Sequence, residues 1–241
     1  MNIIKTENYD EMSNMAANKI IEMVRTNPKA TIGLATGSTP KGVYKKLIED
    51  HKANGTTYKQ ATTVNLDEYV GISRNDPHSY HFFMREQLFS HIDIPLEQTY
   101  IPDGMAKDLQ LECSRFESVI QDLDGVDLQL LGIGHNGHIG FNEPGTSFES
   151  RTHVVTLAES TRKANARFFP SIEDVPARAI TMGIATIMES KEIILLASGS
   201  SKAEAIARLV NGEVNENFPA SVLKLHKNVT IIADKDALQF I

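Results

Sequence analysis

Two kinds of apolar spacing alternate along the chain. Apolar side chains that recur every three or four residues predict helices, and short apolar or alternating runs predict strands. Helices are expected over 9–25, 41–52, 79–91, 108–123, 160–169 and 201–210. Strands are expected over 31–35, 61–66, 126–131, 151–158, 179–182, 192–197 and 229–233. Apolar strands separated by helices are typical of parallel sheets. The pattern therefore predicts a three-layer α/β fold, a largely parallel, Rossmann-like sheet with helices on both faces.

No tract rich in proline or serine interrupts this pattern, so we expect a single domain over 1–241. The formal net charge is −7, which argues against unspecific binding to nucleic acid or to a membrane surface. No apolar run approaches the roughly 18–20 residues of a membrane helix. Cys113 is the only cysteine, which excludes an intrachain disulfide. The amino terminus shows no signal-peptide core, so a cytoplasmic protein is expected.

The most informative segment follows the strand expected at 126–131. It reads Gly-Ile-Gly-His-Asn-Gly-His-Ile-Gly-Phe-Asn-Glu-Pro-Gly over 132–145. Glycines let a backbone approach a ligand closely, and histidine and glutamate are frequent proton carriers. Ligands of open α/β sheets bind beyond the carboxyl ends of the strands. The loop is therefore predicted to line an active site.

One interpretation of this loop is a dinucleotide site. Gly132, Gly134 and Gly137 have the fingerprint spacing, and Glu159 lies where a ribose-binding acid would stand. That motif must open a helix, however, and further glycines and Pro144 interrupt the segment that follows. This interpretation is therefore disfavoured.

Two other interpretations use the polar side chains. His135, His138 and Glu143 could bind a metal, but the two histidines lack helical spacing and no further histidine or cysteine stands nearby. Alternatively, His138 carries a proton and Glu143 orients the imidazole. We favour this acid–base interpretation, with no metal.

Two expected strand-to-helix turns are rich in glycine and hydroxyl groups. Residues 37–41 read Gly-Ser-Thr-Pro-Lys, and residues 199–202 read Gly-Ser-Ser-Lys. Free amides at a helix amino terminus bind anions, although serine and threonine also cap helices there. Two such turns on one sheet favour a phosphate-bearing ligand.

Two further clusters carry charge. Asp67 and Glu68 stand where a strand is expected to end, and at least one of them is expected to be merely solvated. Arg162, Lys163 and Arg167 share one predicted short helix. They would suit an anionic ligand, although a solvated helix face is the simpler interpretation of this helix alone.

Several of these segments together resemble one family. They are Leu34-Ala-Thr-Gly-Ser-Thr-Pro40, Asn65-Leu-Asp-Glu-Tyr69, the loop 132–144, Ser150-Arg-Thr152, Thr161-Arg-Lys-Ala-Asn-Ala-Arg-Phe-Phe169 and Gly199-Ser-Ser-Lys-Ala203. In this order and spacing the chain resembles the glucosamine-6-phosphate deaminase (isomerising) family, the glucosamine/galactosamine-6-phosphate isomerases. The related 6-phosphogluconolactonases, hydrolases of a sugar phosphate, share the fold but differ within the loop, and they are the alternative.

The resemblance implies that glucosamine 6-phosphate is opened, isomerised and deaminated to fructose 6-phosphate and ammonia, without a metal or an organic cofactor. Asp67 would be the base that transfers the proton between C2 and C1. His138, supported by Glu143, would act in ring opening. Asn136 stands where some relatives carry aspartate, and an amide can orient a neighbour but cannot share a proton.

The resemblance also assigns the phosphate to Gly37, Ser38, Thr39, Arg167 and Lys202, and it assigns no role to His135 or Glu68. It implies an enzyme of amino-sugar catabolism, including N-acetylglucosamine degradation. Its expected class is the hydrolases of carbon–nitrogen bonds, of the cyclic-amidine aminohydrolase type. The expected partner is a small sugar phosphate, with no nucleic acid and no membrane.

Some relatives are hexamers that N-acetylglucosamine 6-phosphate activates through basic residues just beyond the loop. His153 and Val155 stand at those positions here, and the sequence ends soon after its last strand. We therefore expect a non-allosteric monomer or small homo-oligomer. Residues 145–175, which include Arg167, are expected to form a mobile cover over the ligand.

Overall fold

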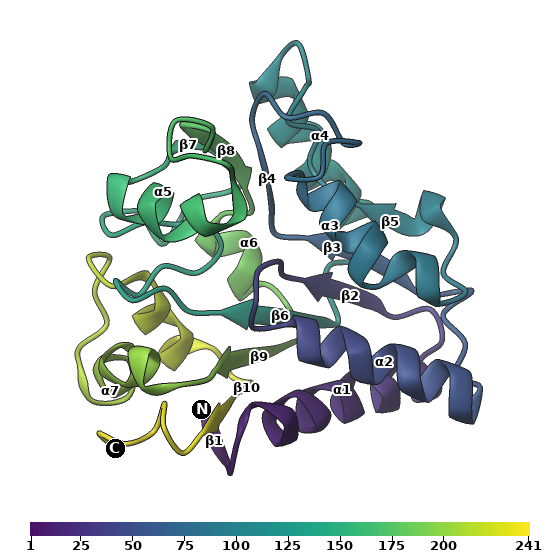
Figure 1. Cartoon of the computed structure of the whole chain (residues 1–241), viewed down its shortest axis with the longest axis horizontal. Coiled ribbons are helices and arrows are strands. Elements are labelled where there is room, and N and C mark those ends of the chain that lie inside the picture. The colour runs from purple at the N-terminus through teal and green to yellow at the C-terminus, as the bar shows by residue number, and fades with distance from the viewer.

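A seven-stranded sheet forms the centre of the computed structural model, which describes residues 1–241 (Figure 1). Its order is β1-β10-β9-β6-β2-β3-β5, and every neighbouring pair is parallel. The strands are β1 (Asn2–Thr6), β2 (Thr31–Leu34), β3 (Thr62–Asn65), β5 (Thr99–Tyr100), β6 (Leu128–Gly132), β9 (Glu192–Ala197) and β10 (Val229–Asp234). The predicted parallel sheet is confirmed.

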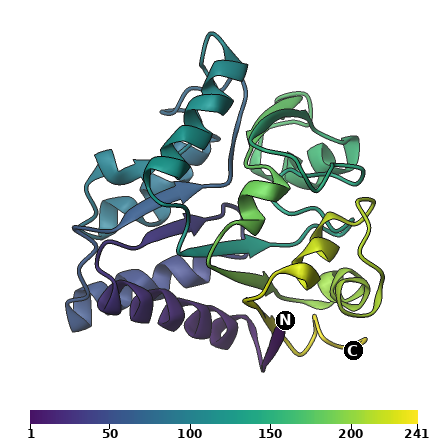
Figure 2. The same cartoon turned by 180° about the vertical axis from the view of Figure 1, so that it is seen from behind.

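Helices cover both faces of this sheet (Figures 1 and 2). One face carries α1 (Tyr9–Thr26), α2 (Lys41–Asn54) and α3 (Tyr80–Gln87), and the other carries α4 (Leu109–Asp122), α6 (Ile184–Met188) and α7 (Ala203–Asn211). Within β6, Leu128 and Leu130 join the core beneath α1 and α2, whereas Leu131 joins the core beneath α4 and α7. Both faces of each strand are buried, which explains the continuous apolar runs.

A second, smaller sheet corrects the prediction of one sheet. The strands expected at 151–158 and 179–182 do not belong to the parallel sheet. They pair antiparallel with each other, and the strand at 179–182 also pairs antiparallel with a third strand. The order is β4-β8-β7, with β4 (Asp67–Tyr69), β8 (Arg178–Thr181) and β7 (His153–Thr156). The side chains of β7 are only half-buried or exposed, unlike those of the central strands. Alternating, partly solvated strands are typical of antiparallel sheets.

Some elements differ from the prediction because they are short. β1, β4, β5 and α6 were not predicted, since two to five residues show no clear period. The helix expected over 160–169 divides into α5 (Glu159–Asn165) and η3 (Ala166–Phe168). The other 3₁₀ helices are η1 (Phe89–His91), η2 (Leu96–Gln98), η4 (Ser200–Lys202) and η5 (Pro219–Leu225). None of the helices combines the length and the apolar character needed to cross a bilayer.

Candidate active site

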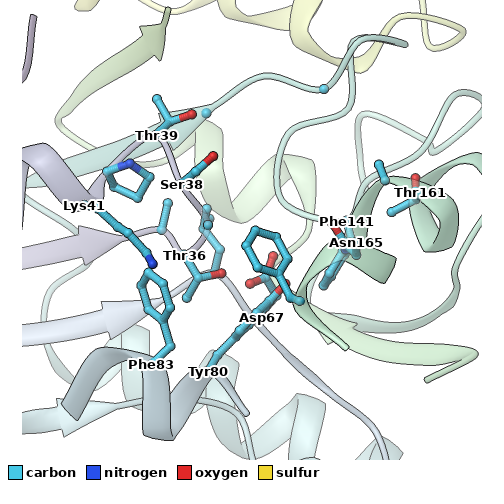
Figure 3. Close-up of a pocket in the computed structure, with 18 of the residues that line it drawn as sticks. Thr36, Ser38, Thr39, Lys41, Asp67, Tyr80, Phe83, Phe141, Thr161 and Asn165 are labelled. Atoms are coloured by element: carbon cyan, nitrogen blue, oxygen red, sulfur yellow. The ribbon is translucent and has the colours of Figure 1, made fainter. Parts of the chain in front are cut away.

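A cavity of about 690 Å³ opens at the carboxyl ends of the central strands. The segments that follow β2, β3, β6 and β9 supply its wall, as expected for an open parallel sheet. Figure 3 shows Ser38 and Thr39 on one side of it, Asp67 near its centre, and Thr161 and Asn165 on the other side. The cavity is large enough for a sugar phosphate.

The turn between β2 and α2 presents polar groups to this cavity. Gly37 has a φ of 96°, a conformation that favours glycine. No side chain caps α2, so Ser38 and Thr39 do not serve as simple helix caps. The Tyr9 hydroxyl lies 3.0 Å from both of their carbonyl oxygens and accepts a 2.8 Å hydrogen bond from the amide of Gly42. The Tyr9 hydroxyl thus holds the backbone of the turn, and Ser38 and Thr39 line the cavity.

Arg167 and Lys202 bring two cations to the cavity wall. Arg167 Nη2 lies 3.4 Å from Ser38 Oγ, and Lys202 Nζ donates a 2.8 Å hydrogen bond to the carbonyl of Ile133. Burial lowers the pKa of Lys202, and the charge of Arg167 lowers it further. Neither cation forms an ion pair with a carboxylate, so their charge is available to an anionic ligand.

Two further residues of the cavity wall, His135 and Lys41, lie outside the set to which the resemblance assigns a role. His135 lies close enough to the cations that the charge of Lys202, followed by burial, lowers its pKa. Lys41 lines the cavity from the start of α2, with Nζ 5.5 Å from the centre of the Phe83 ring (Figure 3). In the sequence, the position of Lys41 just after the Gly-Ser-Thr turn indicates that it lies near the cavity.

The second Gly-Ser turn differs from the first. Asp234, at the end of β10, accepts hydrogen bonds from the hydroxyl of Ser198 and from the amide of Gly199, the latter at 3.0 Å. A carboxylate of the chain itself therefore occupies two of the donors at this turn. Of this turn, Lys202 supplies the cation that faces the cavity.

Asp67 is the buried carboxyl group of the cavity. It lies on β4 opposite Thr181 and is only 7% exposed. Burial raises its pKa from 3.8 to about 8, and the charge of Glu68 adds to the shift. No group of the chain donates a hydrogen bond to the Asp67 carboxyl group, so this group is available to a bound ligand.

Glu68 is not solvated, contrary to the expectation for this carboxylate pair. It is 1% exposed and accepts hydrogen bonds from the amides of Tyr80 and His81, both at 3.0 Å. His81 Nδ1 lies 2.9 Å from the same carboxylate. Glu68 therefore fixes the amino terminus of α3, the helix whose Tyr80 and Phe83 line the cavity.

The loop after β6 assembles the predicted acid–base group. Asn136 Nδ2 donates a 2.7 Å hydrogen bond to Glu143 Oε2, and Asn136 Oδ1 accepts a hydrogen bond from the backbone amide of His138 at 3.2 Å. His138 Nδ1 lies 3.7 Å from Glu143 Oε2, beyond hydrogen-bond distance, and has no other partner. A Cβ at Gly134 would lie 2.3 Å from the His138 ring, so any other residue there would displace the imidazole.

Glu143 is held as a carboxylate. Burial alone would raise its pKa, but the His138 imidazole, the Thr161 hydroxyl and the Asn136 amide together lower it below the usual value. Thr161 belongs to α5 and donates its hydroxyl to Glu143 Oε1. The sequence assigned no role to Thr161, because its contact with Glu143 joins residues 18 positions apart and only the fold brings them together.

The basic cluster on α5 is divided. Arg162 donates to the carbonyl oxygens of Ile172 and Val175, and Lys163 forms an exposed ion pair with Glu159 at 2.6 Å. Of the three cations, Arg167 lines the cavity. The solvated or structural interpretation therefore holds for the first two.

The two alternative interpretations of the loop can be compared with its geometry. No group of three or more histidine, cysteine, aspartate or glutamate side chains is arranged to hold a metal ion. A dinucleotide fingerprint requires a helix directly after Gly137, and the chain instead continues without a helix to β7. Glu159 is exposed and paired with Lys163.

Comparison with known proteins extends these observations over the whole chain. The model of the family described as "Glucosamine-6-phosphate isomerases/6-phosphogluconolactonase" matches residues 5–232. The chain belongs to this family. The similarity covers nearly all of the sequence and not the site motifs alone.

Two curated relatives indicate the branch of the family. A glucosamine-6-phosphate deaminase of Geobacillus sp. is 60% identical over 100% of this chain and 96% of its own length. Glucosamine-6-phosphate deaminase 1 of Bacillus subtilis is 53% identical over 98% of both chains. These names correct the expected class: an assignment to hydrolases of the cyclic-amidine type is wrong, because the relatives are deaminases of an isomerase family.

Solved structures give the same result. A monomeric glucosamine-6-phosphate deaminase is 52% identical, covers both chains fully, and superposes with a TM-score of 0.99. A 6-phosphogluconolactonase from Trypanosoma cruzi is 24% identical over 99% of this chain and 96% of its own, with a TM-score of 0.80. At that identity the second likeness shows a shared fold and no more.

Proposed function

We propose that the chain catalyses the isomerising deamination of glucosamine 6-phosphate, in which substrate and water give fructose 6-phosphate and ammonia. The observation that carries the proposal is that one cavity holds two cations without carboxylate partners and a buried carboxyl group with a raised pKa. The full-length likeness to glucosamine-6-phosphate deaminases supports the same substrate.

Arg167 and Lys202 bind the phosphate dianion, and the turn Gly37, Ser38 and Thr39 adds its amides and hydroxyls. Arg167 already approaches Ser38, so one phosphate group can contact both. Charge-assisted hydrogen bonds and a helix amino terminus are both suited to a dianion. This contact fixes the sugar carbons relative to the acid–base groups.

Ring opening falls to His138. The imidazole removes the proton of the C1 hydroxyl and a proton is delivered to the ring oxygen, so that the bond between C1 and that oxygen breaks and an aldehyde forms. One ring nitrogen, Nε2, can do both, because it accepts the C1 hydroxyl proton as a base and then donates it to the ring oxygen as part of the imidazolium. Glu143 and Asn136 orient the imidazole without taking part in covalent chemistry.

Isomerisation falls to Asp67. Its carboxylate removes the C2 proton, the electron pair forms a double bond between C1 and C2, and the aldehyde oxygen gains a proton. The same carboxyl group then returns a proton to C1, which leaves an imine at C2. Water adds to this carbon and ammonia leaves. The ammonium group of the bound substrate favours the ionised form of Asp67, which burial alone disfavours.

The test is an assay of ammonia and fructose 6-phosphate with purified protein, in EDTA and without nucleotide. The proposal predicts that both products form in equal amounts from glucosamine 6-phosphate, and that 6-phosphogluconolactone is hydrolysed far more slowly. Faster loss of the lactone, or activity only after a divalent metal is restored, would contradict it.

We propose in addition that the enzyme works as a monomer, as the solved 52%-identical relative is described. We place it in the cytoplasm, because a phosphorylated sugar does not cross a membrane unaided. A role in N-acetylglucosamine degradation follows if the amino sugar phosphate arises there by deacetylation.

A further inference from the structure

Glu143 is held by two uncharged donors that come from different parts of the chain. Asn136, from the loop after β6, donates to Oε2 at 2.7 Å. Thr161, from α5, donates its hydroxyl to Oε1. Thr161 is 5% exposed, so water does not compete for this hydrogen bond. The position of the carboxylate therefore depends on where α5 lies.

The segment that carries Thr161 also carries the phosphate contact. α5 (Glu159–Asn165) continues directly into η3 (Ala166–Phe168), and Arg167 of η3 reaches Ser38 at 3.4 Å. Asn165, between them, donates a 2.9 Å hydrogen bond to the hydroxyl of Tyr69, which stands two residues after Asp67 on β4. One short helical element thus connects the predicted phosphate site with Glu143.

The imidazole on the other side of Glu143 is not yet engaged. His138 Nδ1 is buried, has no hydrogen-bond partner, and lies 3.7 Å from Glu143 Oε2. An N–H···O hydrogen bond needs about 2.7–3.2 Å, so a displacement of less than about 1 Å would form it. With Nδ1–H donated to the carboxylate, Nε2 becomes the acceptor that ring opening requires.

We propose that Thr161 is a positioning residue that couples phosphate binding to ring opening. When the phosphate draws Arg167 inward, the α5–η3 element carries Thr161 with it, and the Thr161 hydroxyl moves Glu143 into contact with His138. The inference rests on the proposed function, since it concerns the same cavity. It assigns to the phosphate a second role, in which binding energy far from the reacting carbons organises the acid–base group.

Three variants separate this role from simple packing. Thr161→Val keeps the shape but removes the donor, and Thr161→Ser keeps the donor. Ser160→Ala removes an exposed hydroxyl from the same helix and is the matched control. We expect Thr161→Val to lower kcat about tenfold or more, the usual loss for a hydrogen bond to a charged group, with KM for glucosamine 6-phosphate within about threefold. Thr161→Ser and Ser160→Ala should remain near wild type.

The decisive experiment supplies the substrate as two separate pieces, the amino sugar and the phosphate-like dianion. Unphosphorylated glucosamine is supplied with or without phosphite dianion, and ammonia release is measured. The wild type and Thr161→Ser should be activated by phosphite, whereas Thr161→Val should bind it equally, as judged by competition against glucosamine 6-phosphate, without activation. Equal activation of Thr161→Val, no activation of the wild type, or a change in KM alone would overturn the inference. Failure of the proposed function is distinguishable, because the wild type would then release no ammonia from glucosamine 6-phosphate.

Discussion

Asp67 and Glu68 are adjacent on β4, yet their carboxyl groups meet different surroundings. Glu68 accepts hydrogen bonds from the amino terminus of α3 and is sealed from solvent. Asp67 faces the cavity, and burial together with the charge of Glu68 raises its pKa to about 8. Glu68 therefore has a structural role, whereas the Asp67 carboxyl group is available to exchange a proton with a ligand.

Because of its raised pKa, Asp67 should lower the free energy of unfolding of the ligand-free protein in a pH-dependent way. Below about pH 4 the group is protonated in both folded and unfolded chains. Between its ordinary pKa of 3.8 and about 8 the unfolded chain releases a proton that the folded chain keeps, so the free energy of unfolding falls as the pH rises. Asp67→Asn removes this cost, and its Tm should exceed that of the wild type increasingly from pH 4 to pH 8.

The matched control for this stability experiment is Asp236→Asn, which removes one negative charge from an exposed position near the end of the chain. Its effect on Tm should not grow with pH in the same way. Thermal unfolding of the three proteins at several pH values decides the point, and a constant difference between Asp67→Asn and the wild type would refute a raised pKa.

The phosphate site predicts that Arg167→Ala and Lys202→Ala each weaken the binding of glucosamine 6-phosphate. The expected loss is about 1.5–3 kcal/mol, roughly a ten- to hundredfold rise in KM, because a charge-assisted hydrogen bond disappears. Lys163→Ala is the control, since Lys163 pairs with Glu159 on the surface. Steady-state kinetics of the three variants check this prediction. If Arg167→Ala and Lys202→Ala kept the KM of the wild type, the phosphate site would be wrongly assigned.

Tyr9 supports the phosphate turn without lining the cavity. Its hydroxyl contacts the Ser38 and Thr39 carbonyls and the Gly42 amide, so Tyr9→Phe should loosen the turn. We expect KM to rise about fivefold, the effect of about 1 kcal/mol for an uncharged hydrogen bond, with kcat nearly unchanged. Tyr100→Phe provides a comparison on β5. Unaltered KM in Tyr9→Phe would mean that the turn is rigid without this hydroxyl.

N-acetylglucosamine 6-phosphate should not activate the enzyme. His153 Nδ1 lies 2.8 Å from the Arg151 carbonyl, Val155 packs on the aromatic cluster around Tyr69, and the Arg151 side chain is already paired with Glu189. A second phosphate site would need convergent free cations or amides. Rates at low substrate with and without the acetylated sugar should agree, and a several-fold increase or a Hill coefficient well above one would reveal an effector site elsewhere.

Much of the fold followed from the sequence because central parallel strands are buried on both faces. The run 126–131 is apolar for that reason, and its carboxyl end had to meet the ends of its neighbours at one edge. The second sheet did not follow, because β4 is only three residues long and its antiparallel pairing with β8 leaves no periodic signal. Periodicity reports which side chains are buried but not which strands are paired.

The candidate site was predictable where a motif faces the cavity and not where a contact is tertiary. Asp67, His138 and Arg167 stand in recognisable segments and line one cavity. The hydrogen bonds of Glu68 to α3 and of Thr161 to Glu143 depend on the fold, and so does the occupation of the second Gly-Ser turn by Asp234. Similar Gly-Ser turns therefore differ in their free donors, because Asp234 accepts hydrogen bonds at the second turn.

The central claim is that Asp67 transfers the proton between C2 and C1 of glucosamine 6-phosphate. The most direct measurement is ammonia release at saturating substrate by the wild type and by Asp67→Asn, with substrate affinity measured in parallel. A base acts in the transition state, so kcat should fall by about 10²–10⁴-fold while affinity changes little. An Asp67→Asn variant that keeps kcat within about threefold of the wild type would contradict the account.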